Sequence, residues 1–254
     1  MGNNIRKIWP PVAVMLFLLL SWQAVVVVFD IRPFVLPSPY VIMMQAITDA
    51  SPLLDHTLAT LGVTLLGFTA GAAAGFVLAA LLHLIPGAKS GFYPLLVLTQ
   101  NVPIMALGPL LVLWFGFGIL PRVILIIIVC FFPIAVAMLT GLMQSDPKLV
   151  TYMRMIGATK RQQFWRLELP NSIPYLFSGL KIAASYSVIS AIYAESIGAS
   201  KGLGYYMLLS RNGFETAKIF CAIAIIIFIS LIIFGAISLA ERLFLRGRTP
   251  SKGG

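Results

Sequence analysis

TLATLGVTLLGFTAGAAAGFVLAALL, residues Thr57–Leu82, is the stretch that decides the fold of this chain. It contains no charged residue and no proline, and it is longer than the roughly 20 apolar residues that a helix needs to cross a bilayer. Gly67, Gly71, Gly75 and Ala79 recur every four residues and therefore share one helical face. Small side chains on such a face let another backbone approach closely, which predicts either internal packing or a subunit contact.

The composition of the whole chain also indicates a membrane protein. Its 254 residues are 59% hydrophobic and only 10% charged, whereas soluble domains are roughly one-quarter charged. The net charge of +10 does not indicate nucleic-acid binding, because the basic residues lie in short runs between apolar stretches. Nucleic-acid binding favours a continuous basic stripe or patch.

The hydropathy pattern predicts an all-α integral membrane protein of about six transmembrane helices, organised as one transmembrane domain over residues 1–254. The expected spans are 8–29, 57–82, 93–115, 123–143, 174–197 and 219–240. The fifth is long enough to cross only if Lys181 extends its charged end toward one face and Glu195 lies near the other. With both termini in the cytoplasm, most Lys and Arg residues of the short connections fall on the inner side, as the positive-inside rule expects.

The connection from Gln144 to Pro170, on the predicted inner side, carries helical signals of its own. Asp146 can cap a helix that begins at Pro147, because proline lacks only a donor that is unpaired at that position. An apolar ridge at helical spacing follows. It consists of Leu149, Tyr152, Met153 and Ile156.

The second half of this connection is also punctuated. Gly157 is expected to end the first helix, because a left-handed C-terminal position favours glycine. Thr159 and Gln162 form a capping box for a second short helix that runs toward Pro170. Two interpretations fit such a segment on physical grounds alone: an amphipathic helix that lies on anionic lipid, and a ridge that docks in the groove of another protein.

No catalytic constellation is evident in the sequence. The string Gly87–Ser90 lacks the glycine directly before lysine that a phosphate-binding loop requires. Cys130 and Cys221 lie inside apolar runs without metal or redox spacing, and His56 and His83 are isolated. We therefore expect no enzyme activity, no cofactor and no metal site in this chain.

Polar residues inside the predicted spans are candidates for a substrate path. Burying polar groups at membrane depth is unfavourable unless they are paired, so such groups are functional candidates. In the third and fifth spans they are Gln100, Asn101, Tyr186, Ser190, Tyr193 and Glu195. Interhelical hydrogen bonding or packing would explain the same residues, and the sequence leaves both alternatives open.

The loop also resembles a known motif. The pattern consists of Gly157, then nine residues, Leu167, one residue and Leu169-Pro170. It resembles the cytoplasmic loop motif of binding-protein-dependent ABC import permeases. That motif opens with Glu-Ala-Ala, where this chain has Thr151-Tyr152-Met153. The resemblance implies a coupling helix, here about Lys148 to Gln163, that seats in a cleft of a separate cytoplasmic ATPase subunit. The residues expected to couple are Leu149, Tyr152, Met153, Ile156, Gly157, Ala158, Thr159 and Pro170.

Other stretches resemble the nitrate, sulfonate and taurine branch of these permeases. They are Leu36–Pro39, Gln100–Pro103, Leu113–Gly118 and Gly202–Tyr205. Within that branch, Cys130–Val136 and Phe177–Ala183 are most similar to permeases for pyrimidine precursors of thiamine.

The resemblance implies an importer subunit in the bacterial inner membrane that works in the lipid bilayer as a homodimer by alternating access. Its expected partners are the ATPase and an extracytoplasmic binding protein, which would dock near Arg32–Leu54 and Ser200–Phe214. The expected solute is a pyrimidine thiamine precursor, with sulfonate, taurine, nitrate or riboflavin-like solutes as alternatives. A secondary transporter is the rival of another class.

Overall fold

The computed structural model describes residues 2–85, 87–99 and 101–246, with side chains from Trp9 onward. Every regular element in these ranges is helical, which confirms the predicted fold class. In chain order the elements are α1 (Gly2–Val28), α2 (Pro39–Thr48), α3 (Ala50–Leu84), α4 (Ala88–Thr99), α5 (Ile104–Phe115), α6 (Ile119–Met143), α7 (Pro147–Met155), α8 (Lys160–Gln163), the π-helical turn η1 (Phe164–Glu168), α9 (Leu169–Gly198), α10 (Leu203–Asn212) and α11 (Thr216–Leu245).

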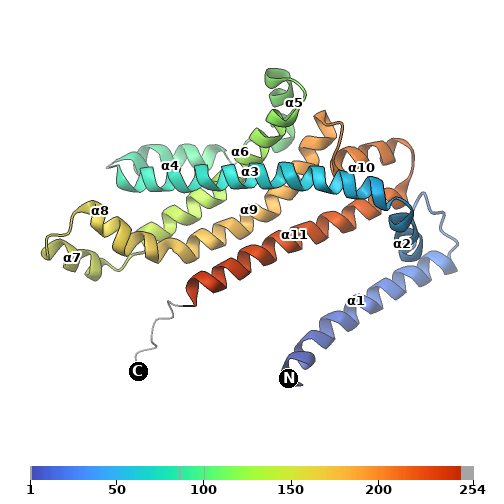
Figure 1. The fold of residues 1–254 in the computed structure, drawn as a ribbon, viewed down its shortest axis with the longest axis horizontal. Coiled ribbons are helices and arrows are strands. Elements are labelled where there is room, and N and C mark those ends of the chain that lie inside the picture. Colours follow the sequence, from blue (N-terminus) through green and yellow to red (C-terminus); the bar gives the residue numbers. More distant parts are fainter. Residues whose placement is uncertain (1, 86, 100, 247–254) are drawn as a thin grey trace.

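The centre of the bundle is formed by α3, α6 and α9, and α11 packs along α9 (Figure 1). The short helices α7 and α8 lie at one end of the long axis, and α2 and α10 lie at the other. We call these the loop end and the α10 end. The first helix, α1, diverges from the bundle, and few of its residues are buried.

Five helices are long and apolar enough to cross a membrane, and the count becomes six if the bent pair α4 and α5 forms one span. The two halves of that pair meet at 94°. Pro103 lies at the N-cap of α5 and has no N–H group to continue a helix, so its position suits a break. Gln100 lies outside the described residues, within the same break.

The glycine face of α3 packs against α6 of the same chain. The position that a Cβ would take on Gly67 meets Ile126, on Gly71 it meets Cys130, and on Gly75 it meets the carbonyl oxygen of Phe131. All three glycines are buried. Of the two interpretations left open by the spacing, internal packing is therefore the one that the structure shows.

The helix of the fifth predicted span begins earlier than expected. Instead of starting near residue 174, α9 begins at Leu169 and follows α8 and η1 without a loop. The backbone N–H of Leu169 donates to the carbonyl of Phe164, five residues back, which is the bond of a π-helix. This wide turn directly precedes Pro170, which lacks an N–H, so the chain keeps its helical course across the proline.

Lys181 makes an ion pair with Glu241 of α11. Both side chains are mostly buried. The sequence pattern predicts that Lys181 extends its charged end toward a membrane face. In the folded chain its ammonium group instead donates a hydrogen bond to the carboxylate of Glu241, 60 positions away. Pairing reduces the penalty for an ammonium group at this depth.

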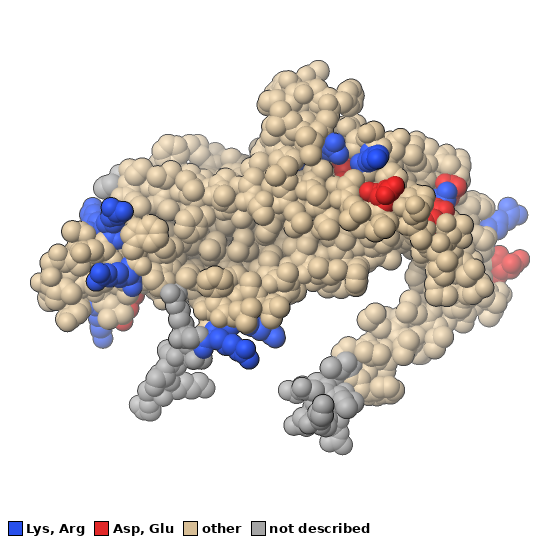
Figure 2. Space-filling view, viewed as in Figure 1, with Lys and Arg blue, Asp and Glu red and all other residues tan. Residues whose placement is uncertain are grey.

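Charged side chains gather at the loop end, around α10 and at the end of α11, and the surface between these places is nearly free of them (Figure 2). At the loop end the cluster is mainly basic, whereas acidic and basic side chains are mixed around α10. This distribution is typical of a protein whose middle lies in hydrocarbon. The basic excess at the loop end also favours that end as the cytoplasmic one.

Two glycines of α3 provide a test of the packing. Gly75→Ala should lower the thermal stability of the purified protein, because the new methyl group meets the Phe131 carbonyl at 2.6 Å, and overpacking of this kind costs about 1–3 kcal/mol. Gly62→Ala is the matched control, since a Cβ there meets nothing within 4 Å. Alanine at position 62 should leave the thermal stability of the protein unchanged or raise it slightly. Melting curves in detergent that coincide for the two variants would contradict the close contact.

Candidate functional site

The loop between α6 and α9 has the capped geometry that its sequence predicts. The Asp146 carboxylate accepts a hydrogen bond from the Lys148 backbone N–H at 2.8 Å and so caps α7. At the start of α8, the Thr159 hydroxyl accepts from the Gln162 N–H, and the Gln162 side chain accepts from the Thr159 N–H. Both caps are confirmed.

Gly157 ends α7 in the left-handed region, with φ of 77°. The N–H of Ala158 donates to the carbonyl of Met153 at 2.9 Å, and the N–H of Gly157 donates to that of Arg154 at 3.0 Å. This pair of bonds is a Schellman motif, which requires the residue at the position of Gly157 to have positive φ. The turn therefore changes the direction of the chain between α7 and α8.

The apolar ridge of α7 is largely exposed in the described chain. Leu149, Tyr152 and Ile156 are 49%, 60% and 62% exposed, and Met153 is partly buried. Figure 1 shows α7 projecting beyond the end of the bundle. A ridge of this kind is stable only when lipid or another protein covers it.

The part of the loop that follows the ridge in the chain contacts the helical bundle at several points. Phe164 is buried in the core cluster that contains Leu82, Leu139 and Leu142. The carboxylate of Glu168 contacts Nε2 of His83 at 2.8 Å, which joins η1 to the end of α3.

A second tie joins the end of α6 to the start of α9. The Gln144 side chain accepts a hydrogen bond from the hydroxyl of Tyr175, and its backbone carbonyl accepts one from the amide of Asn171. These ties connect the residues that flank the loop to α3, α6 and α9.

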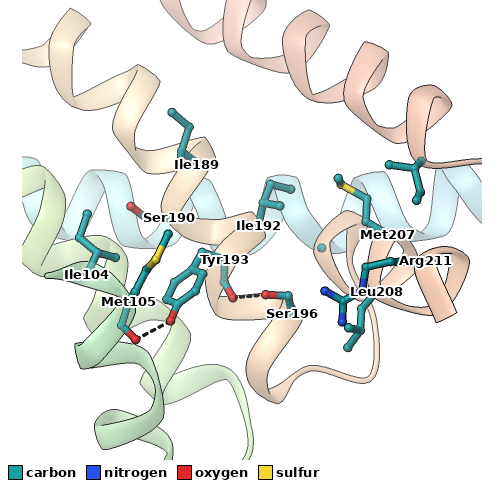
Figure 3. A pocket seen from close by; sticks show the side chains of 12 residues that line it. Ile104, Met105, Ile189, Ser190, Ile192, Tyr193, Ser196, Met207, Leu208 and Arg211 are labelled. Carbon is teal, nitrogen blue, oxygen red and sulfur yellow. Dashed lines mark hydrogen bonds between the residues drawn. The ribbon is translucent and has the colours of Figure 1, made fainter. Parts of the chain in front are cut away.

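Two cavities lie along one side of α9. The first has a volume of about 470 Å³ and lies among α5, α9, α10 and the start of α11 (Figure 3). The second, of about 560 Å³, is bounded by the break between α4 and α5 and by α6 and α9. Ile104 lines both, so the two cavities adjoin. We call them the α10 cavity and the α6 cavity.

The candidate path residues divide between these cavities and the protein interior. Tyr186 lines the α6 cavity, and Ser190 and Tyr193 line the α10 cavity. Asn101 is exposed at the helix break, where its side chain donates to the carbonyl of Val97.

Glu195 is fully buried and lines neither cavity. Its Oε2 accepts hydrogen bonds from the Thr60 hydroxyl and from the Gly204 N–H, each at 2.9 Å. The structure therefore brings three candidate path residues to the cavities, leaves Asn101 beside one of them, and places Glu195 inside the protein.

The hydroxyl groups of the α10 cavity are already engaged. Tyr193 donates to the carbonyl of Met105 at 2.6 Å, Ser196 donates to that of Tyr193, and Ser190 donates to that of Tyr186. Figure 3 shows the first two of these bonds at the edge of the cavity. Arg211 is the charged residue among those that line this cavity, and its side chain has no hydrogen-bond partner in the described part of the chain.

Arg211 was not identified from the sequence. Gly204, Met207, Leu208 and Arg211 have the spacing of one helical face, and all four line the α10 cavity. That periodicity was visible in the sequence. It could not show which helices this face would meet.

A helical bundle with an exposed apolar ridge at one end and cavities beside a broken helix suits a membrane subunit of a transporter. The chain is the permease subunit of an ABC importer. Residues 71–246 match the family of binding-protein-dependent transport system inner membrane components, and the chain belongs to that family. Members of this family are membrane subunits that work with an ATPase and a binding protein, and they are not enzymes.

Several relatives are similar over nearly their whole length. The formylaminopyrimidine transport permease of Halalkalibacterium halodurans is 34% identical, with 94% of this chain and 95% of the relative covered. The riboflavin transport permease of Chloroflexus aurantiacus is 32% identical, covering 94% and 91%. The taurine transport permease of Escherichia coli is 27% identical, covering 98% and 91%.

Solved structures share the fold. An inward-facing MetNI methionine ABC transporter chain gives a TM-score of 0.64 at 20% identity, covering 73% of this chain and 92% of that one. An amino acid ABC transporter chain gives 0.66 at 18% identity, covering 79% and 97%.

Gly157 provides a test of the loop. Gly157→Val should separate ATP hydrolysis from uptake, because a β-branched residue at φ of 77° is disfavoured by roughly 1–2 kcal/mol or more and shifts the turn that orients α7. The measurements are ATPase activity and solute uptake in vesicles that contain the assembled transporter. Gly235→Val is the matched control on α11, where a Cβ meets nothing within 4 Å. Normal uptake by the Gly157 variant would refute the role of this turn.

Proposed function

We propose that this chain imports a pyrimidine precursor of thiamine, delivered by a soluble binding protein and driven by a separate ATPase. The observation that carries this proposal is the 34% identity to the formylaminopyrimidine permease across nearly the full length of both chains. The cavities support it, because their walls are largely aliphatic and each contains a tyrosine, Tyr186 or Tyr193. Such walls suit a small planar ring.

In this proposal, the solute follows the side of α9 on which the two cavities lie. Tyr186 and Tyr193 contact it in turn, and Ser190 shapes the path between them. Asn101 and Gln100 belong to the broken segment beside the path. Irregular backbone at membrane depth is tolerated where it faces protein or water, which supports a path at this break.

The coupling proposal concerns α7. Leu149, Tyr152, Met153 and Ile156 seat in a cleft of the ATPase. The turn at Gly157, Ala158 and Thr159 sets the angle of the ridge, and the π-turn before Pro170 joins it to α9. The exposure of the ridge and the ties behind it support this role.

We further propose a homodimer with both termini in the cytoplasm. The loop end then meets the ATPase, and the binding protein docks on the opposite end, near Arg32–Leu54 and Ser200–Phe214. The largely basic loop end supports this orientation (Figure 2).

A second candidate solute is an anion such as taurine or another sulfonate. Arg211 favours it, because its exposed guanidinium lies in the lining of the largely apolar α10 cavity, where it can donate charge-assisted hydrogen bonds to an anionic group. The taurine permease is also among the relatives.

Uptake by the reconstituted transporter separates the two solutes. Vesicles that contain this chain, its ATPase and its binding protein should accumulate a labelled formylaminopyrimidine in the presence of ATP, and unlabelled taurine should not compete.

Tyr186→Ala should reduce uptake severalfold. Leu113→Ala is the control, since Leu113 is 77% exposed and lines neither cavity. Accumulation of taurine alone would replace the pyrimidine with the anion, and uptake without ATPase would reject an ABC importer.

Labelling of single cysteines tests the orientation. Met155→Cys, at the loop end, should react with a membrane-impermeant maleimide only when the cytoplasmic face is accessible. Phe214→Cys, at the α10 end, should react from the outside of intact cells. The two native positions are 81% and 78% exposed, so both cysteines are accessible to reagent. The reverse pattern would invert the proposed topology.

A further inference from the structure

The start of α10 is held by side chains from two other helices. Three consecutive backbone N–H groups, those of residues 202, 203 and 204, donate to His56 Nδ1 at 3.0 Å, Thr60 Oγ1 at 2.8 Å and Glu195 Oε2 at 2.9 Å. The first N–H groups of a helix have no partner within the helix and need an acceptor. Here every acceptor comes from α3 or α9.

One hydroxyl links the two holding helices. Thr60 Oγ1 accepts from residue 203 and donates its own proton to Glu195 Oε2 at 2.9 Å. Thr60 and Glu195 are both 0% exposed. The contact therefore joins α3, α9 and α10 in a site that water does not reach, where a polar group left without a partner is costly.

Two glycines allow this approach. A Cβ on Gly202 would overlap the carboxylate of Glu195, and a Cβ on Gly204 would overlap the carbonyl oxygen of Ile192. Gly202 also has φ of 121°, which disfavours other residues. The Gly-Leu-Gly sequence is therefore explained by the contact of bare backbone with Glu195.

The rest of α10 forms a wall of the α10 cavity. Met207, Leu208 and Arg211 line it from one side, and Tyr193 of α9 lines it from another (Figure 3). α10 is also held by Tyr206, a buried residue outside the cavity lining, whose hydroxyl donates to Asp49 Oδ2 at 2.8 Å. Burial, and then this hydrogen bond, raise the pKa of Tyr206, so its hydroxyl remains a donor.

We propose that Glu195 is a positioning residue that sets the place of α10, and through it the shape of the α10 cavity, without contacting the solute. The inference depends on the proposed function in one respect, namely that this cavity belongs to the solute path. It assigns Glu195 the role of a hydrogen-bond acceptor for Thr60 and Gly204.

The geometry predicts different results for two substitutions of Glu195. Both hydrogen bonds reach Oε2, whereas Oε1 is buried and has no hydrogen-bond partner in the described part of the chain. A glutamine can place its carbonyl oxygen at the position of Oε2 and its amide group at the position of Oε1, so it keeps both bonds. Alanine loses both. A residue that acted through its negative charge would instead fail as glutamine.

The experiment measures how fast a cysteine in the cavity wall reacts in the purified transporter complex, without any solute. Leu208→Cys reports on the cavity, and Leu209→Cys, at a position that is 50% exposed and outside the cavity lining, reports on general loosening of α10. Each is combined with Glu195→Gln, Glu195→Ala or the control Glu215→Gln. Glu215 is an exposed carboxylate near the same end that pairs with Lys218. The complex without an introduced cysteine gives the background from Cys130 and Cys221.

The expected result is that Glu195→Ala changes the reaction rate at position 208 by about tenfold, as the loss of about 1.4 kcal/mol of hydrogen bonding implies. Glu195→Gln and Glu215→Gln should leave it within about twofold, and position 209 should not change. Thr60→Val, which keeps the side-chain size but removes the linking hydroxyl, should give the alanine result if Glu195→Ala does not assemble.

Three results would overturn the inference: a glutamine variant that behaves like alanine, an alanine variant with an unchanged rate at position 208, or equal changes at positions 208 and 209. Uptake adds a further measurement. Glu195→Ala should lose uptake while Glu195→Gln keeps it, whichever solute is transported. A failure of the pyrimidine assay would therefore reject the proposed solute and leave the labelling result standing.

Discussion

In a bilayer, each backbone N–H or C=O group without a hydrogen-bond partner costs several kcal/mol, and the rest of this structure depends on that constraint. It explains why every regular element of the described chain is helical, and it bears on three places where the helices are irregular. The break before Pro103 lies beside the α6 cavity. At residues 164–168 the backbone forms a π-turn instead of opening. At residues 202–204 the backbone N–H groups donate to side chains of other helices.

Small residues determine how the helices meet. The glycines of α3 bring its backbone against α6, and Gly179 of α9 approaches Ile134 of α6 in the same way. Because these contacts leave little free volume, α3, α6 and α9 form a stiff core. The ties of Glu168 to His83 and of Tyr175 to Gln144 extend this core to the loop.

The α10 end contrasts with the loop end. At the loop end an apolar ridge is exposed and available to a partner, whereas at the other end polar contacts hold a short helix against the bundle. The cavity beside that helix is largely apolar, and Arg211 is the charged residue of its lining. Fixing α10 therefore also fixes where this charge lies, because Gly204, which donates to Glu195, and Arg211 line the same cavity.

The sequence by itself determined the features that depend on neighbours within one or two helical turns. These are the membrane helices, the caps at Asp146 and Thr159, the left-handed glycine at position 157 and the glycine face of α3. The tertiary structure alone decided the pairing of Lys181 with Glu241, the continuous course of α9 across Pro170, the place of Arg211 and the burial of Glu195. The reason is physical: capping and periodicity act locally, whereas Thr60 and Glu195 are 135 positions apart and meet only because three helices pack together.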